Sequence, residues 1–281
     1  MDYMQEYEKW LASPALTPEE HAELESIRGD EKEIRERFYG PLEFGTAGLR
    51  GVIGAGTNRM NVYTVGRATQ GLADYLNAKY DHPSVAIGYD SRIKSDLFSK
   101  EAAAVLAGNG IKVYLYKELE PTPCLSFAVR QLGAQSGIIL TASHNPAAYN
   151  GIKLFGPDGY KLSDEVELAI EEMLEGDFTG RLAAPADLGR AKRVDGERAR
   201  YVESAKRTLA RQISFEGLRV VVDCANGAAY KVAPEVLWEL GAEVISLGVD
   251  PNGLNINRDC GSTSLAAITE KVREVRADIG I

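Results

Sequence analysis

Residues 136 to 146 of the chain read SGIILTASHNP, beginning at Ser136. The first half is a short apolar run bounded by small polar residues, which predicts a buried β-strand. The second half predicts a tight loop, because the small Ala142 is followed by the turn-forming pair Asn145-Pro146. The segment therefore holds the Ser143 hydroxyl outward at the carboxyl end of a strand, where α/β proteins place functional loops.

The surrounding sequence predicts two βαβ units. The first combines strands at 84–90 and 111–116 with a helix at 97–108, and the second combines strands at 218–223 and 242–247 with a helix at 232–240. Asp90 and Val113 are 23 positions apart, and the corresponding Asp223 and Val244 are 21 apart. This internal repeat predicts an α/β protein with tandem domains, each a mixed, mainly parallel sheet flanked by helices.

We expect a helical extension at residues 1–38, a first domain at 39–180 and a second at 181–281. In the extension, Thr17-Pro18-Glu19-Glu20 carries a hydroxyl N-cap, a proline at the first helical position and a glutamate three residues after the cap. A helix is expected from about 163 to 175, a linker at 176–196 and a helix near 198–209. The last ten residues predict a helix that runs into a strand at 279–281, so the chain looks truncated there.

Composition excludes several classes of protein. The 281 residues have a formal net charge of −9, which argues against nonspecific nucleic-acid binding but leaves room for a locally basic pocket. The three cysteines, Cys124, Cys224 and Cys260, form no CxxC pair, so we expect idle or buried thiols. No secretion signal opens the chain, and no apolar run approaches the roughly 18 residues of a membrane helix. We therefore expect a cytoplasmic protein with no membrane contact.

Ser143-His144 is the sharpest chemical signal. His144 is the one plausible imidazole partner, because His21 and His82 lie in polar contexts that predict exposure. Neighbouring residues in an extended loop point apart, so His144 is poorly placed to deprotonate Ser143 directly, and no GxSxG elbow surrounds the serine. The pattern suits a serine that carries a group, and the alternative is an ordinary turn with a solvent-facing histidine.

Three further segments are candidates for anion binding. FGTAGLRG at 44–51 exposes backbone N–H groups beside Arg50, although a plain turn is the common alternative. Lys153 either lies near a phosphate on Ser143 or is a surface lysine on an edge strand. Asp90-Ser91-Arg92 either braces the glycine-rich loop through an ion pair or caps a helix. Segments 223–229 and 255–262 read mainly as structural turns, with ligand contact at a domain cleft as the minority option.

Taken together and in this order, FGTAGLRG, DSR, TASHNP, NGIK and DCANGAA resemble the α-D-phosphohexomutase superfamily. The resemblance covers essentially the whole chain. It implies an isomerase that moves a phosphoryl group between C1 and C6 of a hexose phosphate, through a phosphoserine and a hexose 1,6-bisphosphate intermediate.

The resemblance also implies roles for individual residues. Ser143 would be the phosphoserine, His144 an assisting acid or base, and Arg50 and Lys153 the cations near the phosphoryl group. The cofactor would be Mg²⁺, bound to Ser143 through its phosphate, with the remaining aspartate ligands in a DGDxDR loop beyond residue 281. The residues expected at the substrate or its phosphate are Thr46, Gly48, Asn145, Asp90 and Arg92.

The sugar is open at this point. Up to about residue 150 the chain is similar to the phosphoglucomutase branch, whereas NGIKLF and LNINRDCGST are closer to bacterial phosphoglucosamine mutase. We expect glucose or mannose phosphate first, with glucosamine phosphate as the alternative, and a non-catalytic sugar-phosphate binding module as the alternative of another class. The chain is either a fragment or a composite of two parents, and we expect no turnover from these 281 residues alone.

Overall fold

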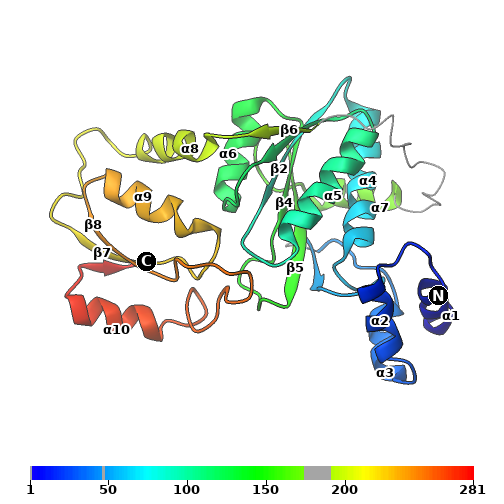
Figure 1. Ribbon diagram of the computed structural model, residues 1–281. Helices are drawn as coiled ribbons and strands as arrows, with labels where there is room; N and C mark the ends of the chain where they lie inside the picture. The colour runs from blue at the N-terminus through cyan, green and yellow to red at the C-terminus, as the bar shows by residue number, and fades with distance from the viewer. Residues whose placement is uncertain (1, 46–47, 174–190) are drawn as a thin grey trace.

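The computed structural model describes residues 2–45, 48–173 and 191–281, which form two α/β units and a small helical extension (Figure 1). The first unit is a six-stranded sheet in the order β1-β5-β4-β2-β3-β6. Strands β4, β2, β3 and β6 run parallel, while β5 is antiparallel to both β4 and β1. The sheet is therefore mixed and mainly parallel, as the sequence predicts. Its strands are β1 Leu49–Val52, β2 Ser84–Tyr89, β3 Lys112–Tyr116, β4 Ser136–Leu140, β5 Tyr149–Phe155 and β6 Ala191–Val194.

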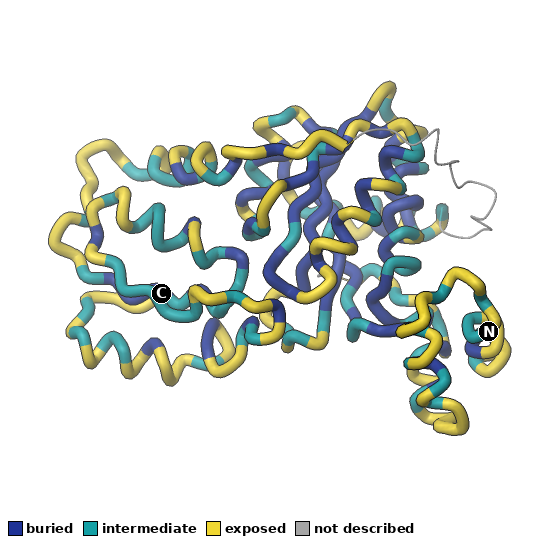
Figure 2. The backbone as a smooth tube through the Cα atoms, in the orientation of Figure 1, coloured by how far each residue is buried: buried dark blue, intermediate teal, exposed yellow. Residues whose placement is uncertain are grey.

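Helices cover both faces of this sheet. Apolar side chains of α4 (Val62–Lys79), α5 (Ser95–Gly108) and α7 (Asp164–Met173) share one core with inward residues of the strands. On the other face, α6 (Thr122–Leu132) buries Leu125 and Val129 against Ile139 and Phe155. Figure 2 shows the result as a continuous buried interior along the strands, which makes this sheet a rigid support for the loops at its edge.

The second unit is a parallel three-stranded sheet in the order β8-β7-β9. Its strands are β7 Arg219–Asp223, β8 Glu243–Leu247 and β9 Ile279–Gly280, and its helices are α8 Glu197–Lys206, α9 Val232–Glu239 and α10 Ala266–Val275, with a short 3₁₀ turn at Ala228–Tyr230. This unit is attached through a shared apolar cluster, in which Tyr116 and Val194 of the first sheet meet Val202 of α8 and Val232 of α9. The two units are thus packed together through side chains.

The internal repeat is confirmed in backbone detail. The Asp90 N–H donates to the Leu140 carbonyl at 3.0 Å, and the equivalent Asp223 N–H donates to the Ile281 carbonyl at 2.8 Å. Each aspartate side chain also accepts the N–H two residues further on, at Arg92 in the first unit (3.0 Å) and at Ala225 in the second (2.8 Å). Both units therefore end their first repeat strand with the same aspartate turn.

The expected linker at 176–196 is wrong in part. Residues 191–194 form β6, which pairs in parallel with β3 at the edge of the first sheet, while residues 176–190 lie outside the described residues. The short sequence AKRV is polar, and three of its four residues are exposed. A polar edge strand has no buried face to produce an apolar pattern, so periodicity cannot reveal it.

The N-terminal segment forms three helices, α1 Tyr3–Leu11, α2 Pro18–Ser26 and α3 Glu31–Phe38. The expected capping box is present, with Thr17 accepting from the Glu20 N–H and the Glu20 carboxylate accepting from the Thr17 N–H. These helices pack around Ala55, and Arg59 pairs with Glu36 of α3. Figure 1 shows them at the opposite end of the molecule from the second unit.

The expectation of buried cysteine thiols is confirmed. All three cysteines are unpaired and buried. Among the described residues, no helix combines the length and the apolar character that crossing a membrane requires.

Candidate functional site

Ser143 lies in the loop that follows β4, as its sequence predicts. The Thr141 hydroxyl oxygen accepts the Ser143 N–H at 3.0 Å, and the Ala142 carbonyl accepts the Asn145 N–H at 3.1 Å, which closes the turn. Ala142 is fully buried, whereas Ser143 is exposed and has a left-handed backbone (φ 57°). Non-glycine residues in this conformation are uncommon and cluster at functional sites. The loop therefore presents the hydroxyl to solvent at some backbone cost.

The Arg92 side chain forms hydrogen bonds to the backbone of this loop. Its guanidinium group is fully buried, and its five N–H donors all have acceptors. Nε donates to the Asp90 carboxylate at 3.2 Å, and the four Nη hydrogens point to backbone carbonyls of the serine loop. These carbonyls belong to Ser143 (2.8 Å), Asn145 (2.8 Å), Pro146 (2.7 Å) and Tyr149 (2.9 Å).

The resemblance led us to expect Asp90 and Arg92 at the substrate or its phosphate, and this geometry differs from that expectation. Arg92 has no donor left for a substrate phosphate, and Asp90 is committed to Arg92 and to the Ser95 hydroxyl (2.9 Å). Burial raises the pKa of Asp90, although Thr141, Arg92 and Ser95 each favour its ionised form. The pair holds the backbone of the Ser143 loop through these hydrogen bonds. We expected the ion pair to brace the glycine-rich loop or to cap a helix. The ion pair is present, but Arg92 binds carbonyls of the Ser143 loop instead, and the sequence could not show which loop it would bind.

The second unit also reaches the Ser143 loop. Asn257 donates through Nδ2 to the carbonyls of Ser143 and Asn145, at 3.1 Å each. Our sequence interpretation treats its segment mainly as a structural turn and does not single out this residue. The one signal in the sequence is the density of polar residues in the segment, because nothing local in it indicates a contact 114 positions away.

Arg50 lies on β1 and also contacts the Ser143 loop. Its register partner on β5 is Gly151, and a Cβ on Gly151 would lie 2.9 Å from the Arg50 Cγ. This close approach lets Arg50 Nη1 donate to the Asn145 side-chain oxygen at 3.2 Å. Arg50 Nε is buried and has no hydrogen-bond partner among the described residues, and burial lowers the pKa of Arg50. An orphaned buried donor on a cation is costly, and an anion would satisfy it.

Lys153 lies on β5, between β1 and β4 in the interior of the sheet, so its placement on an edge strand is excluded. It is half-buried, and a Cβ on Gly48 (φ 84°) would come within 2.9 Å of its Cγ. Arg50, opposite Gly151, shares this sheet face because side chains alternate along β5. Burial lowers the pKa of Lys153, and the charge of Arg50 lowers it further. Gly48 therefore permits two cations to lie side by side.

These features give the site its chemical character. Among the described residues, neither Arg50 nor Lys153 forms an ion pair within 4 Å, although both are partly desolvated and the charge of Asp90 acts on Lys153. Arg50 contacts the Ser143 loop at Asn145, and Lys153 shares the sheet face of Arg50, so the two cations favour an anionic group at this loop. His144 is exposed on the same loop, and Thr46 lies outside the described residues.

A magnesium site is not completed by the residues described. Among them, no three His, Cys, Asp or Glu side chains are placed to hold a metal ion, and the Asp90 carboxylate is occupied by Arg92 and Ser95. The donors of the Ser143 loop therefore do not by themselves fit the oxygen-rich shell that Mg²⁺ requires.

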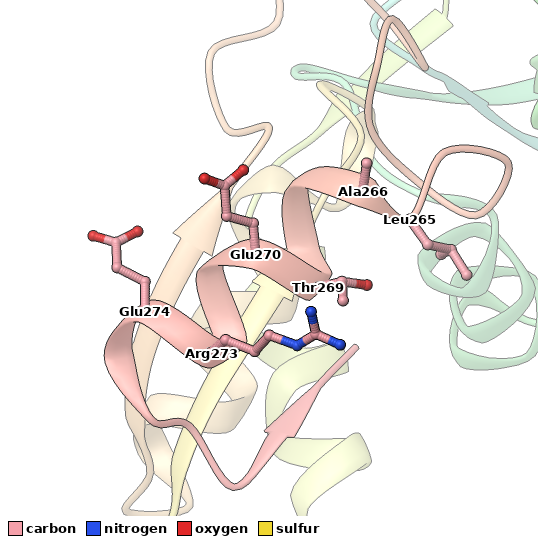
Figure 3. Close-up of a pocket in the computed structure, with 6 residues that line it drawn as sticks. All are labelled: Leu265, Ala266, Thr269, Glu270, Arg273 and Glu274. Carbon is pink, nitrogen blue, oxygen red and sulfur yellow. The ribbon is translucent and has the colours of Figure 1, made fainter.

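A separate hollow of about 670 Å³ lies along α10, and Figure 3 shows the six residues that line it. All of them belong to one stretch of chain: Leu265, Ala266, Thr269, Glu270, Arg273 and Glu274. Because α10 and the residue before it supply every side chain, the hollow is an open face with no converging groups, unlike the Ser143 loop.

Comparison with known proteins agrees with this geometry. Models of the phosphoglucomutase/phosphomannomutase family match residues 41–180 (alpha/beta/alpha domain I) and 199–281 (alpha/beta/alpha domain II). Phosphoglucosamine mutase of Azorhizobium caulinodans is 54% identical over 238 residues, and that of Rhizobium meliloti is 49% identical over 246. Each alignment covers 85% of this chain but 52% of the relative, so the chain spans about half the length of these relatives.

Solved structures show the same relationship. A candidate phosphomannomutase from Thermus thermophilus superposes with a TM-score of 0.67 at 33% identity, covering 76% of this chain and 47% of the other. A phosphoglucomutase/phosphomannomutase family protein from Burkholderia thailandensis shares the fold, with a TM-score of 0.69 at 24% identity, covering 84% of this chain and 51% of the other. The two matching models together account for most of the chain, and the chain therefore belongs to the phosphoglucomutase/phosphomannomutase family, of which it carries domains I and II.

Proposed function

We propose that Ser143 carries the phosphoryl group in a phosphohexomutase whose substrate is glucosamine phosphate. The observation that carries the proposal is the exposed Ser143 on a loop fixed by Arg92, which Arg50 contacts at Asn145 and where Arg50 and Lys153 share one sheet face. The names of the relatives at 49–54% identity support glucosamine phosphate over the glucose or mannose phosphate that we expected first.

The reaction has two matched steps. In the first, the P–O bond to Ser143 Oγ breaks and Oγ takes up a proton, while the sugar hydroxyl oxygen forms a new bond to phosphorus and gives its proton to a base. The sugar is then a 1,6-bisphosphate, and the reverse transfer from its other phosphate returns the group to Ser143. Arg50 and Lys153 stabilise the charge on the transferring oxygens.

The remaining site residues have supporting roles in this proposal. His144 would exchange the proton, because its imidazole is exposed on the same loop as Ser143. Asn145 is oriented by Arg50. The Gly48 N–H donates to the Gly45 carbonyl at 2.8 Å, so it is not free for a phosphate, and a phosphate contact at Thr46 stays a prediction. When bound, Mg²⁺ would neutralise further charge on the phosphoserine, with its carboxylate ligands supplied from outside the described residues.

The test is phosphoryl transfer to the purified chain. The chain is incubated separately with the 1,6-bisphosphates of glucosamine, glucose and mannose, and its intact mass is recorded over time. We expect an added mass of roughly 80 Da (one phosphoryl group), formed fastest from the glucosamine compound and absent in Ser143→Ala. Ser163→Ala is the matched control, because Ser163 lies outside the site and its loss should leave the transfer unchanged.

Three outcomes would overturn the proposal in whole or in part. A stable chain that gains no phosphoryl group from any bisphosphate would favour the non-catalytic binding module. Phosphorylation that persists in Ser143→Ala would place the acceptor elsewhere. Faster transfer from the glucose or mannose compound would reject glucosamine phosphate while retaining Ser143 as the carrier.

A further inference from the structure

The backbone carbonyls of the Ser143 loop are held from both units at once. The carbonyl oxygens of Ser143 and Asn145 each accept one hydrogen from Arg92 Nη2 at 2.8 Å and one from Asn257 Nδ2 at 3.1 Å. A carbonyl oxygen has two lone pairs, so both acceptor sites on both carbonyls are filled. Arg92 of the first unit donates two of these four hydrogen bonds, and Asn257 of the second unit donates the other two.

The second unit presents Asn257 on a stiff pair of loops. Asn257 has a left-handed backbone (φ 57°), and its N–H donates to the Ala225 carbonyl at 2.9 Å. The Asp223 carboxylate ties the two loops together, accepting from the Ala225 N–H at 2.8 Å and from the Gly261 N–H at 2.6 Å. Ala225, Asn226 and Asp259 are also left-handed. Such conformations persist where the surrounding structure fixes them, so the Asn257 amide is held in place before it meets the serine loop.

The loops of the second unit also contact the segment that carries Arg92. The Ser91 hydroxyl donates to the Asn226 carbonyl at 2.9 Å. A Cβ on Gly253 would lie 2.9 Å from the Ile93 Cγ2, which shows how closely the two units approach there. The contacts of the second unit therefore converge on residues 91–93 and 143–145, the two parts of the first unit that fix the serine.

We propose that Asn257 is a positioning residue for Ser143, and that the docking of the second unit sets the orientation of the serine loop. When the second unit is in place, the Asn257 amide completes the hydrogen bonds of the loop carbonyls; when it moves away, those carbonyls lose half of their donors and the loop loosens. The part of this inference that concerns catalysis rests on the proposed function of Ser143, whereas the loop clamp does not.

The test compares two asparagine-to-aspartate substitutions in one loop. Asn257→Asp keeps the side-chain shape and tolerates the left-handed backbone, but it removes both donors. Asn255→Asp is the matched control, because the Asn255 amide donates within its own loop, to the Asp250 carbonyl at 2.9 Å. Asn257→Gly is a second variant that removes the amide without backbone strain or added charge.

The first readout is hydrogen exchange at the N–H groups of Ser143, Asn145 and Tyr149, whose bonds close the serine loop. We expect about tenfold faster exchange there in Asn257→Asp and Asn257→Gly, and less than about twofold change in Asn255→Asp. Unchanged exchange in both Asn257 variants would overturn the clamp. So would an equal rise in the Asn255 control, because the effect would then be a general loosening of the second unit.

The second readout is the rate at which a sugar bisphosphate phosphorylates Ser143. We expect about tenfold slower transfer in both Asn257 variants and an unchanged rate in Asn255→Asp. If the unsubstituted chain accepts no phosphoryl group, the proposed function fails while the exchange measurement still decides the clamp. Faster exchange with an unchanged transfer rate would refute the link between docking and reactivity.

Discussion

Replacing Arg92 tests how the site is supported, because one buried side chain serves five acceptors. Arg92→Lys keeps the positive charge but offers three donors in place of five. At least two of the five hydrogen bonds that Arg92 donates, to the Asp90 carboxylate and to the carbonyls of residues 143, 145, 146 and 149, are therefore lost, although the carbonyls of residues 143 and 145 keep their bonds from Asn257. Arg92→Met removes all five donors and leaves the Asp90 carboxylate without its ion pair.

The expected losses of unfolding free energy follow from the burial of the Arg92 side chain. A buried acceptor left without a donor costs about 1–3 kcal/mol, so we expect Arg92→Lys to lower the free energy of unfolding by about 2–4 kcal/mol. Breaking a buried ion pair on one side costs about 3–5 kcal/mol, which is the expectation for Arg92→Met at neutral pH. The pKa of Asp90, raised by burial already, should rise further in Arg92→Met. A carboxyl whose pKa is higher in the folded state loses stability as pH rises, so Arg92→Met should be less destabilising at low pH.

The assay is urea unfolding at pH 4.5 and pH 7.5, with Asp90→Asn combined with Arg92→Met as the control. The combined variant carries no charge at positions 90 and 92, and its destabilisation should depend less on pH than that of Arg92→Met alone. Arg92→Lys within about 0.5 kcal/mol of the unsubstituted chain would refute the reasoning, because that is the range of an ordinary surface substitution. Equal destabilisation of Arg92→Met at both pH values would refute the role of Asp90.

Two further predictions concern backbone approach and a buried carboxyl. Gly151→Ala should cost at least about 2 kcal/mol in urea unfolding, because its Cβ would lie 2.6 Å from the Leu49 carbonyl oxygen and 2.9 Å from that of Thr141. Gly40→Ala, where nothing lies within 4 Å, is the control, and equal costs would contradict the close-packing argument. Burial raises the pKa of Glu120 to about 7 from 4.5, so its ionisation in the folded state costs stability as pH rises through 7. Relative to the unsubstituted chain, Glu120→Gln should gain up to about 3 kcal/mol between pH 4 and pH 8 in the same assay, and a pH-independent difference would contradict the assignment.

Much of the fold is readable from the sequence, because the strands that position the site are buried. The apolar run at residues 136–140 and the turn chemistry after it are enough to define β4 and its loop. The aspartates at 90 and 223 mark equivalent strand ends, and they make equivalent bonds. Burial pattern and turn chemistry act locally, so local sequence reports them.

The remaining features depend on contacts between distant residues. Asp90-Ser91-Arg92 predicts an ion pair, but four of the five Arg92 bonds go to carbonyls more than fifty residues away, and a carbonyl carries no sequence signal. Asn257 reaches its partners across two units. Strand β6 is polar because it lies at a sheet edge. In each case the information lies in the packing of units rather than in any one segment.

The central claim is that a phosphate on Ser143 is neutralised by Arg50 and Lys153, and ³¹P NMR of the phosphorylated chain tests it most directly. The second pKa of a phosphoserine is about 6 in water, and two neighbouring cations stabilise the dianion. The account predicts a pKa for phosphorylated Ser143 clearly below 6, which returns toward 6 in Arg50→Met and in Lys153→Met. A phosphate that titrates near 6 in the unsubstituted chain, and is unmoved by either substitution, would contradict it.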